Sequence, residues 1–315
     1  MKSTKLSSIL SNLSLPILLL ACILVFSLLN DKFFTQLNLT NILVQNFHIA
    51  VMSTAVLILM VIGGIDLSIG FQISVVSVVV AKAIKTETLP IGLAIVLGIA
   101  VCMILALFNG VMSRVLKSHT MIVSLGTMAV FQGLSYLISE SKTFNALPRD
   151  YMYIGQGRIW GWLPLNGIIT LVILLVIGYF LQRTYLGRQM YAVGDNPEAA
   201  RLAGLNVWKI KYVAYVIAGA LVGVTAILLS SRSGSADSTM GPDLTFTGIT
   251  ACVLAGVALK GGEGRLWKVI VAVFVLGVLS NGMQLIGLGT YPQYIAKGTI
   301  MLISIYMSNR TLKQA

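Results

Sequence analysis

The stretch GRQMYAVGDNPEAARLAG, residues 187–204, is a polar segment that lies between long apolar runs. It carries charges of both signs and contains start and stop signals of its own for a short helix. The flanking runs are apolar enough to lie in lipid. We therefore interpret the polar segment as a surface that a membrane protein presents to another molecule.

The helix signals in this segment are local and specific. Asn196 is a good N-cap, Pro197 suits the first helical position, and Glu198 complements the positive end of the helix dipole. The alanine-rich residues 199–203 favour helix, and Gly204 ends it. A short capped helix with small side chains suits insertion into a groove on another protein. A helix lying on its own bundle would show the same pattern, so both readings stay open at this point.

Composition defines the solvent of the rest of the chain. Hydrophobic residues make up 57% of the sequence and charged residues 10%, and the mean hydropathy is +0.91. Soluble domains carry roughly a quarter charged residues. The fold class is therefore an all-α polytopic membrane protein. The net charge of +12 comes from basic residues at the ends of apolar runs and forms no continuous basic face, which argues against a nucleic-acid partner.

The apolar runs predict about ten transmembrane helices. A span needs about 20 apolar residues, and fewer where other helices surround it. The short segments 69–81 and 246–259 are predicted to be buried among other helices or partly re-entrant. The ten candidate spans are 15–29, 47–62, 69–81, 90–112, 120–139, 166–182, 212–230, 246–259, 267–286 and 291–307.

The distribution of charge sets the predicted orientation. If the N-terminus is inside, most Lys and Arg residues fall on the inner side and most acidic residues on the outer side, as the positive-inside bias requires. Both termini and the loop 183–211 are then cytoplasmic. The break at Gly63-Gly64 matters because merging 47–81 into one span would reverse the predicted orientation of every later span and place the loop 183–211 outside. A second break, Gly261-Gly262, is a weak sign of an inverted repeat.

Several uncharged or capping polar residues fall inside or beside the predicted spans. Asp66 can cap a helix that begins after Gly63-Gly64, or it can act on a substrate or ion. The amides and hydroxyls suit a neutral, hydroxyl-rich solute, and they equally suit interhelical hydrogen bonds worth about 0.6 kcal/mol each. The candidate pathway residues are Asp66, Ser68, Asn109, Thr127, Asn281 and Gln284.

Missing motifs exclude other classes of protein. The chain contains no GxxxxGK[ST] phosphate loop, HExxH or GxSxG. We therefore expect no catalytic residue, no metal site and no cofactor in this chain. A secondary transporter driven by an ion gradient is the alternative; it needs titratable residues deep in the spans, and only Asp66 and Lys297 are candidates.

Four stretches, taken together, resemble a known family: the permease subunits of bacterial ribose-type sugar ABC importers, which include ribose, xylose, arabinose and autoinducer permeases. The resemblance covers nearly the whole chain. The four stretches are GGIDLSIG at 63–70, GRQMYAVGDNPEAARLAGLNVWKIK at 187–211, LAGVALKGGEGR at 254–265 and NGMQLIGLGTYPQYIAKG at 281–298.

The resemblance implies one permease domain over 1–315 with a type II ABC importer fold, in the bacterial inner membrane. It implies a second permease copy, as a homodimer or paired heterodimer, separate ATPase subunits that bind ATP and Mg, and a periplasmic or lipid-anchored sugar-binding protein. The substrate would be a monosaccharide or related polyhydroxylated solute. The ATPase-coupling residues would be Gly194, Asn196, Pro197, Glu198, Ala199, Ala200, Arg201 and Gly204.

One region departs from the family pattern. Members of the family commonly carry a Glu-Leu-Asp before the eighth span, and the acidic positions fall on Thr245 and Thr247 here, with Asp243 as the nearest acid. The role of an acidic pair at the outer face therefore does not carry over, and the sequence does not name the sugar.

Overall fold

The apolar runs form long helices, and turns rich in Gly, Pro and polar residues separate them. The computed structural model describes residues 2–313, with side chains described for 13–306. The helices are α1 Lys2–Leu29, α2 Gln36–Val61, α3 Ile69–Lys85, α4 Ile91–Val115, α5 Thr120–Ser139, α6 Arg149–Gln156, α7 Leu165–Arg183, α8 Tyr185–Asp195, α9 Pro197–Leu202, α10 Val207–Ser233, α11 Pro242–Leu254, α12 Leu266–Leu285 and α13 Thr290–Lys313. Two short strands, β1 Arg158–Ile159 and β2 Leu163–Pro164, pair antiparallel.

Each predicted span overlaps one of these helices, and six helices in the described part of the chain are long and apolar enough to cross a bilayer. These six are α2, α4, α5, α7, α10 and α12. The number of membrane crossings and their orientation stay predictions. The segment 246–259 was predicted to be buried among other helices or partly re-entrant. It forms the largely buried helix α11, whose bounds differ from the predicted ones: α11 starts at Pro242 and ends at Leu254, because Gly256 adopts a φ of +75° that a continuing helix cannot accommodate.

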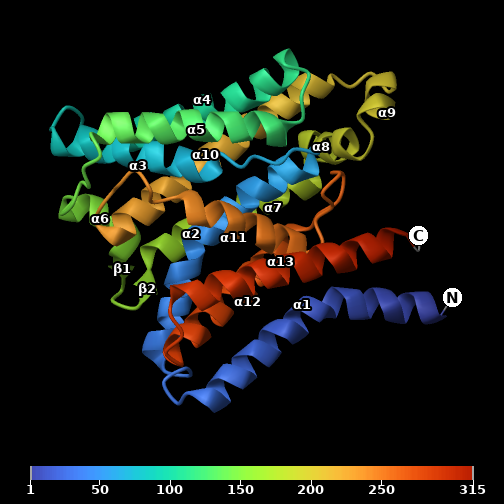
Figure 1. Cartoon of the computed structure of the whole chain (residues 1–315), viewed down its shortest axis with the longest axis horizontal. Coiled ribbons are helices and arrows are strands. Elements are labelled where there is room, and N and C mark those ends of the chain that lie inside the picture. Colours follow the sequence, from blue (N-terminus) through green and yellow to red (C-terminus); the bar gives the residue numbers. More distant parts are fainter. Residues whose placement is uncertain (1, 314–315) are drawn as a thin grey trace.

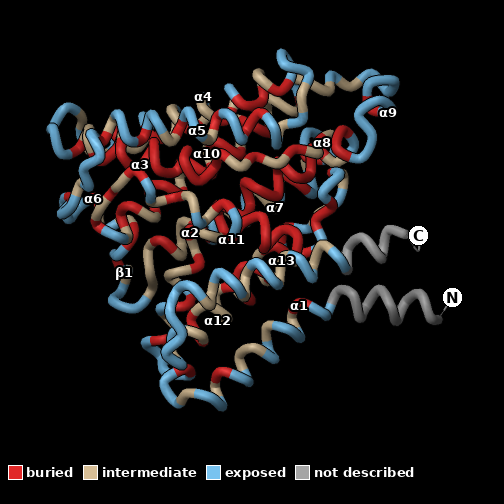
Figure 2. Tube along the Cα trace, viewed as in Figure 1, coloured by how far each residue is buried: buried red, intermediate tan, exposed pale blue. Residues whose placement is uncertain are grey.

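Burial separates the central helices from the peripheral ones. The most apolar part of α2 is 72% buried and that of α10 is 67% buried, whereas the corresponding part of α7 is 17% buried. Figure 2 shows the same gradient, with buried residues concentrated along the middle of the bundle. The exposed sides of α4, α5 and α7 are apolar and therefore face lipid or another subunit.

The short helices mark the two ends of the bundle. Helices α8 and α9 lie at the end where α1 begins and α13 finishes, and α6 with the β1–β2 hairpin lies at the other end (Figure 1). Below, the first of these is called the α9 end and the second the hairpin end. The arrangement agrees with a topology in which both termini and the polar segment share one side.

Candidate functional site

The predicted short helix exists as α9. The Asn196 side chain caps it, since its Oδ1 accepts hydrogen bonds from the backbone N–H groups of Glu198 at 3.1 Å and Ala199 at 2.9 Å. Pro197 occupies the first turn, and Gly204 ends the segment with a φ of +83°. Local side-chain chemistry therefore caps this helix at its start.

Helix α9 stands out from the bundle. Among its residues only Ala200 is buried, while Leu202 is 79% exposed. Glu198 and Arg201 lie on the exposed surface and form a two-pronged ion pair, one prong of which joins Arg201 Nε to Glu198 Oε2 at 3.2 Å. The Arg201 guanidinium, through this hydrogen bond and its charge, holds the pKa of the Glu198 carboxyl below its usual value. Such an exposed, preorganised helix is free to enter a groove on a partner.

The polar segment contains a second helix, α8, that was not predicted from the sequence. Helix α8 is capped by Thr184, whose Oγ1 accepts a hydrogen bond from the Gly187 N–H at 3.1 Å. Its inward face carries Met190, Val193 and Gly194. The spacing of Met190 and Val193 is typical of one face of a helix and could have predicted α8. Two glycines and the neighbouring polar residues weaken this pattern.

The end of α8 meets both glycine breaks. Gly194 lies so close to α2 that an added Cβ would stand 1.7 Å from the Val61 carbonyl oxygen. The Gly262 N–H donates to the same Val61 oxygen at 2.9 Å, and a Cβ on Gly262 would stand 2.6 Å from Asp195 Cα. A Cβ on Gly261 would stand 2.7 Å from the Gly63 N. We call Gly63, Gly194, Gly261 and Gly262 the glycine junction.

Two further features hold the glycine junction in place. Gly63, Gly261 and Gly262 adopt φ values of +76°, +100° and +80°, which favour glycine. The Tyr191 hydroxyl on α8 donates to the Gly264 carbonyl oxygen at 2.9 Å. The junction therefore joins three backbones: the end of α8, the end of α2, and the connection between α11 and α12.

Three of the six predicted pathway residues come together around Asp66. This buried carboxyl accepts on Oδ1 from the Ser68 N–H at 2.8 Å and the Ser68 hydroxyl at 2.6 Å. Its Oδ2 accepts from Asn109 Nδ2 at 2.9 Å and Gln72 Nε2 at 3.1 Å. Gln72, one helical turn after Ser68, was not predicted. Four donors occupy the carboxyl, and the bonds from Gln72 and Asn109 tie α3 to α4. Ser68, not Asp66, is the N-cap residue of α3, and no described side chain caps that helix.

The other three predicted pathway residues lie elsewhere. Thr127 donates to the Ser124 carbonyl oxygen at 3.3 Å. Asn281 exchanges two amide hydrogen bonds with Asn38, at 3.0 and 2.8 Å, and so ties α12 to α2. Gln284 is exposed. The six residues therefore do not form one site.

Two adjoining cavities form a polar groove among α2, α11, α12 and α13, with Arg232 at the end of α10. One has a volume of about 480 Å³ and the other about 230 Å³, and they share Ile49, Thr247 and Lys297. We call the two cavities together the polar groove. Its polar lining residues are Gln45, Asn46, His48, Arg232, Asp243, Thr247, Thr250, Ser280, Thr290, Gln293, Tyr294 and Lys297. This site was not predicted from the sequence, although Asp243, Thr247 and Thr250 recur at helical spacing.

A third cavity, of about 540 Å³, has a different character. It lies beside Gly63-Gly64 and is lined by Arg114, Lys117 and Lys211 among others. Arg114 and Lys211 stand over the Trp208 ring at 5.8 and 5.4 Å from its centroid. A cluster of basic side chains at one cavity agrees with the positive-inside bias, which places Lys and Arg at the cytoplasmic membrane surface.

Comparison with known proteins identifies the class. The family model described as "Branched-chain amino acid transport system / permease component" matches residues 38–305. The ribose import permease protein RbsC of Bacillus subtilis (strain 168) is 31% identical over 290 residues, covering 91% of this chain and 89% of that protein. RbsC of Escherichia coli (strain K12) is 32% identical over 301 residues, covering 93% and 92%.

A second kind of relative carries the name of another sugar. The L-arabinose transport system permease protein AraH of Escherichia coli (strain K12) is 35% identical over 246 residues, covering 77% of this chain and 74% of that protein. No solved structure gave a significant match. The chain belongs to this family of membrane-transport permease components, and it is a multi-pass protein of the bacterial inner membrane.

The Asp66 network predicts a stability effect. Asp66→Asn replaces one accepting oxygen with a donor that faces the donors of Gln72 and Asn109. The loss of a buried hydrogen-bonded carboxyl costs about 1–3 kcal/mol, so the melting temperature of the detergent-purified chain should fall by several degrees. Asp31→Asn, at an exposed position, is the matched control and should leave it unchanged. An Asp66→Asn chain with normal melting but no uptake would contradict the structural role of this carboxyl in linking α3 to α4.

Proposed function

We propose that this chain is the permease subunit of an ATP-driven ABC importer that carries a monosaccharide or a related polyhydroxylated solute. The names of the relatives support a sugar: ribose for two of them and L-arabinose for the third. The description of the family model refers to branched-chain amino acids. The sugar reading is favoured because the relatives that cover most of the chain are sugar permeases.

The observation that carries the proposal is the exposed, capped helix α9 joined to the bundle through the glycine junction. We assign ATPase coupling to eight residues of this region. They are Gly194, Asn196, Pro197, Glu198, Ala199, Ala200, Arg201 and Gly204. Exposed side chains on α9 supply the docking surface, and Gly194 supplies the close contact with α2.

The proposed assembly contains this chain as a single permease domain, 1–315, with ten spans and cytoplasmic termini. A second permease copy completes the pathway, separate ATPase subunits bind ATP and Mg, and a periplasmic or lipid-anchored protein delivers the sugar. The chain itself needs no cofactor and performs no chemistry. The position of α9 at the end of the bundle where α1 begins and α13 finishes supports this orientation.

The mechanism follows from the contacts at the glycine junction. ATP-driven closure of the ATPase subunits displaces α9, which continues directly into α8 through Asn196. Because Gly194 lies against Val61 and Gly262 with no side chain between them, the displacement passes to α2 and to the connection after α11. The movement of α2 and α11 then opens the sugar pathway to one side of the membrane and closes it to the other.

Coupling should depend on the exposed charges of α9. In proteoliposomes with the ATPase and the sugar-binding protein, Glu198→Ala and Arg201→Ala should each lower sugar-stimulated ATP hydrolysis at least about tenfold, as for an interface hot spot. Membrane insertion should be normal. Arg158→Ala, at an exposed arginine of the hairpin end, is the control and should be neutral. Unchanged coupling in the α9 variants would refute the role of this helix.

The same preparation separates the two transport classes. Uptake should stop when ATP is depleted and should persist in the presence of a protonophore. Uptake that survives ATP depletion but collapses with the protonophore would identify a secondary transporter and overturn the proposal.

Gly194→Ala should uncouple the transporter. The added methyl group has no room beside the Val61 oxygen, so α8 must move away from α2, and overpacking of this kind costs about 1–3 kcal/mol. The expected result is an assembled complex that hydrolyses ATP but takes up little sugar. Gly126→Ala, where nothing lies within 4 Å of the added Cβ, is the control. Normal uptake per ATP in Gly194→Ala would show that this contact does not transmit the movement.

A further inference from the structure

The polar groove extends from the ends of some of its helices to the middle of α2. His48 lies twelve residues after the start of α2, which is about 18 Å along the axis of this 26-residue helix. Asp243 and Thr290 lie near the first residues of α11 and α13, at the opposite ends of these helices from the junction side. The groove therefore runs from the first residues of α11 and α13 toward the middle of α2.

The lining of the polar groove suits a hydroxyl-rich ligand. Uncharged amide, hydroxyl and imidazole groups outnumber the charged side chains, which are Arg232, Asp243 and Lys297. The rings of Phe246 and Tyr294 also line it and offer flat surfaces for the C–H faces of a sugar. The groove thus combines hydrogen-bonding groups with apolar faces, as the surface of a monosaccharide does.

Two polar groups of the lining differ in their hydrogen bonding. His48 is 5% exposed and lines the smaller cavity, and its Nδ1 has no hydrogen-bond partner in the described protein. A buried polar atom without a partner is costly unless a ligand or water satisfies it. At the other end of the groove, the Tyr294 hydroxyl donates to Asp243 Oδ2 at 2.5 Å and links α13 to α11.

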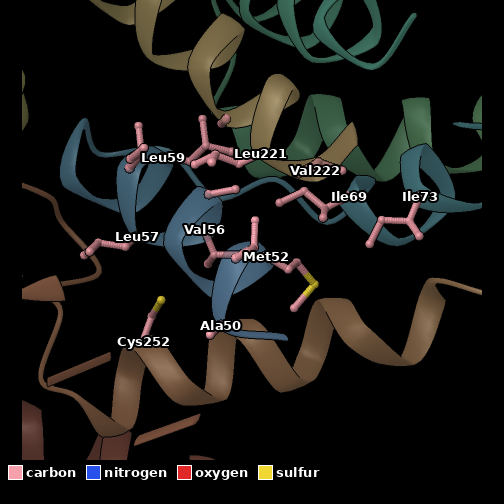
Figure 3. Close-up of a cluster of buried hydrophobic side chains, with 14 of the residues drawn as sticks. Ala50, Met52, Val56, Leu57, Leu59, Ile69, Ile73, Leu221, Val222 and Cys252 are labelled. Atoms are coloured by element: carbon pink, nitrogen blue, oxygen red, sulfur yellow. The ribbon is translucent and has the colours of Figure 1, made fainter. Parts of the chain in front are cut away.

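The polar groove stops at a packed apolar contact between α2 and α11. A Cβ on Gly248 would stand 2.5 Å from Met52 Cε and 3.3 Å from a Val56 methyl group. One turn further along α11, Cys252 Sγ lies 3.4 Å from the Ser53 carbonyl oxygen. Figure 3 shows Met52, Val56 and Cys252 within this buried cluster. We call the contact of Met52, Ser53 and Val56 with Gly248 and Cys252 the α2–α11 seam.

We propose that the polar groove is the chamber that receives the sugar and that the α2–α11 seam is its inner gate. This inference rests on the proposed function and extends it to named residues. On α2, the α2–α11 seam lies between the groove residues and the glycine junction, and on α11 it overlaps the inner end of the groove at Thr250. A displacement at the junction therefore reaches the gate along α2 and through the connection that follows α11.

Thiol labelling tests the chamber directly. Thr247 lines both cavities, is 8% exposed, and donates to the carbonyl oxygen four residues earlier. Thr225 on α10 is buried, makes the same type of bond and lies away from the groove, so it is the matched control. Thr247→Cys and Thr225→Cys are compared in a Cys22→Ser background with a small, membrane-impermeant methanethiosulfonate added from outside.

The Thr247→Cys thiol should react at least about tenfold faster than the Thr225→Cys thiol. Ribose, arabinose or allose at millimolar concentration should slow this reaction, and leucine should not. Equal reaction rates, or protection by none of these sugars, would overturn the chamber. Protection by leucine alone would assign the groove to amino acids and also overturn it.

Uptake by the wild-type transporter separates this failure from failure of the proposed function. If the wild type takes up one of the sugars with ATP but that sugar does not protect the Thr247→Cys thiol, only the chamber is wrong. If the wild type takes up none of the sugars, the proposed function is wrong, whatever the labelling shows.

Discussion

The close approach of Gly194 to the Val61 carbonyl is the constraint on which the rest of the arrangement depends. At this point two backbones touch without a side chain between them, and the Gly262 N–H donates to the same oxygen. Side chains can adjust their rotamers and absorb a small displacement, whereas direct backbone contact leaves little room for such adjustment. The glycine junction therefore joins α8 rigidly to α2 and to the connection that follows α11.

Helix α2, which ends at the glycine junction, and α11, whose following connection enters the junction, form the α2–α11 seam and line the polar groove. Helix α2 is mostly buried and contributes most of its second half to the main core, so it is poorly suited to bend and well suited to move as a body. Helix α11 is short and begins and ends beside glycines. A rigid helix against a short, hinged one is a physical basis for a gate.

Local features were predicted well from the sequence. The caps of α9 depend on neighbouring residues, and the apolar runs depend only on composition. Both could therefore be predicted from the sequence alone. The meeting of the two glycine breaks could not be read, because it joins residues about 200 positions apart that share no local signal. The polar groove was missed for the same reason, since five helices contribute to it. The Asn38–Asn281 pair likewise needs the fold before either amide has a partner.

The opening of the α2–α11 seam is the central claim, and a reversible crosslink measures it. A Cβ on Gly248 would lie 3.6 Å from Ser53 Oγ. Ser53→Cys with Gly248→Cys in a Cys252→Ser background therefore brings two cysteines near each other, and a disulfide between them would lock the seam. Sugar uptake by the reconstituted transporter should stop on oxidation and return on reduction, while the Ser53→Cys single variant should be unaffected. Full uptake with the crosslink formed would contradict the account.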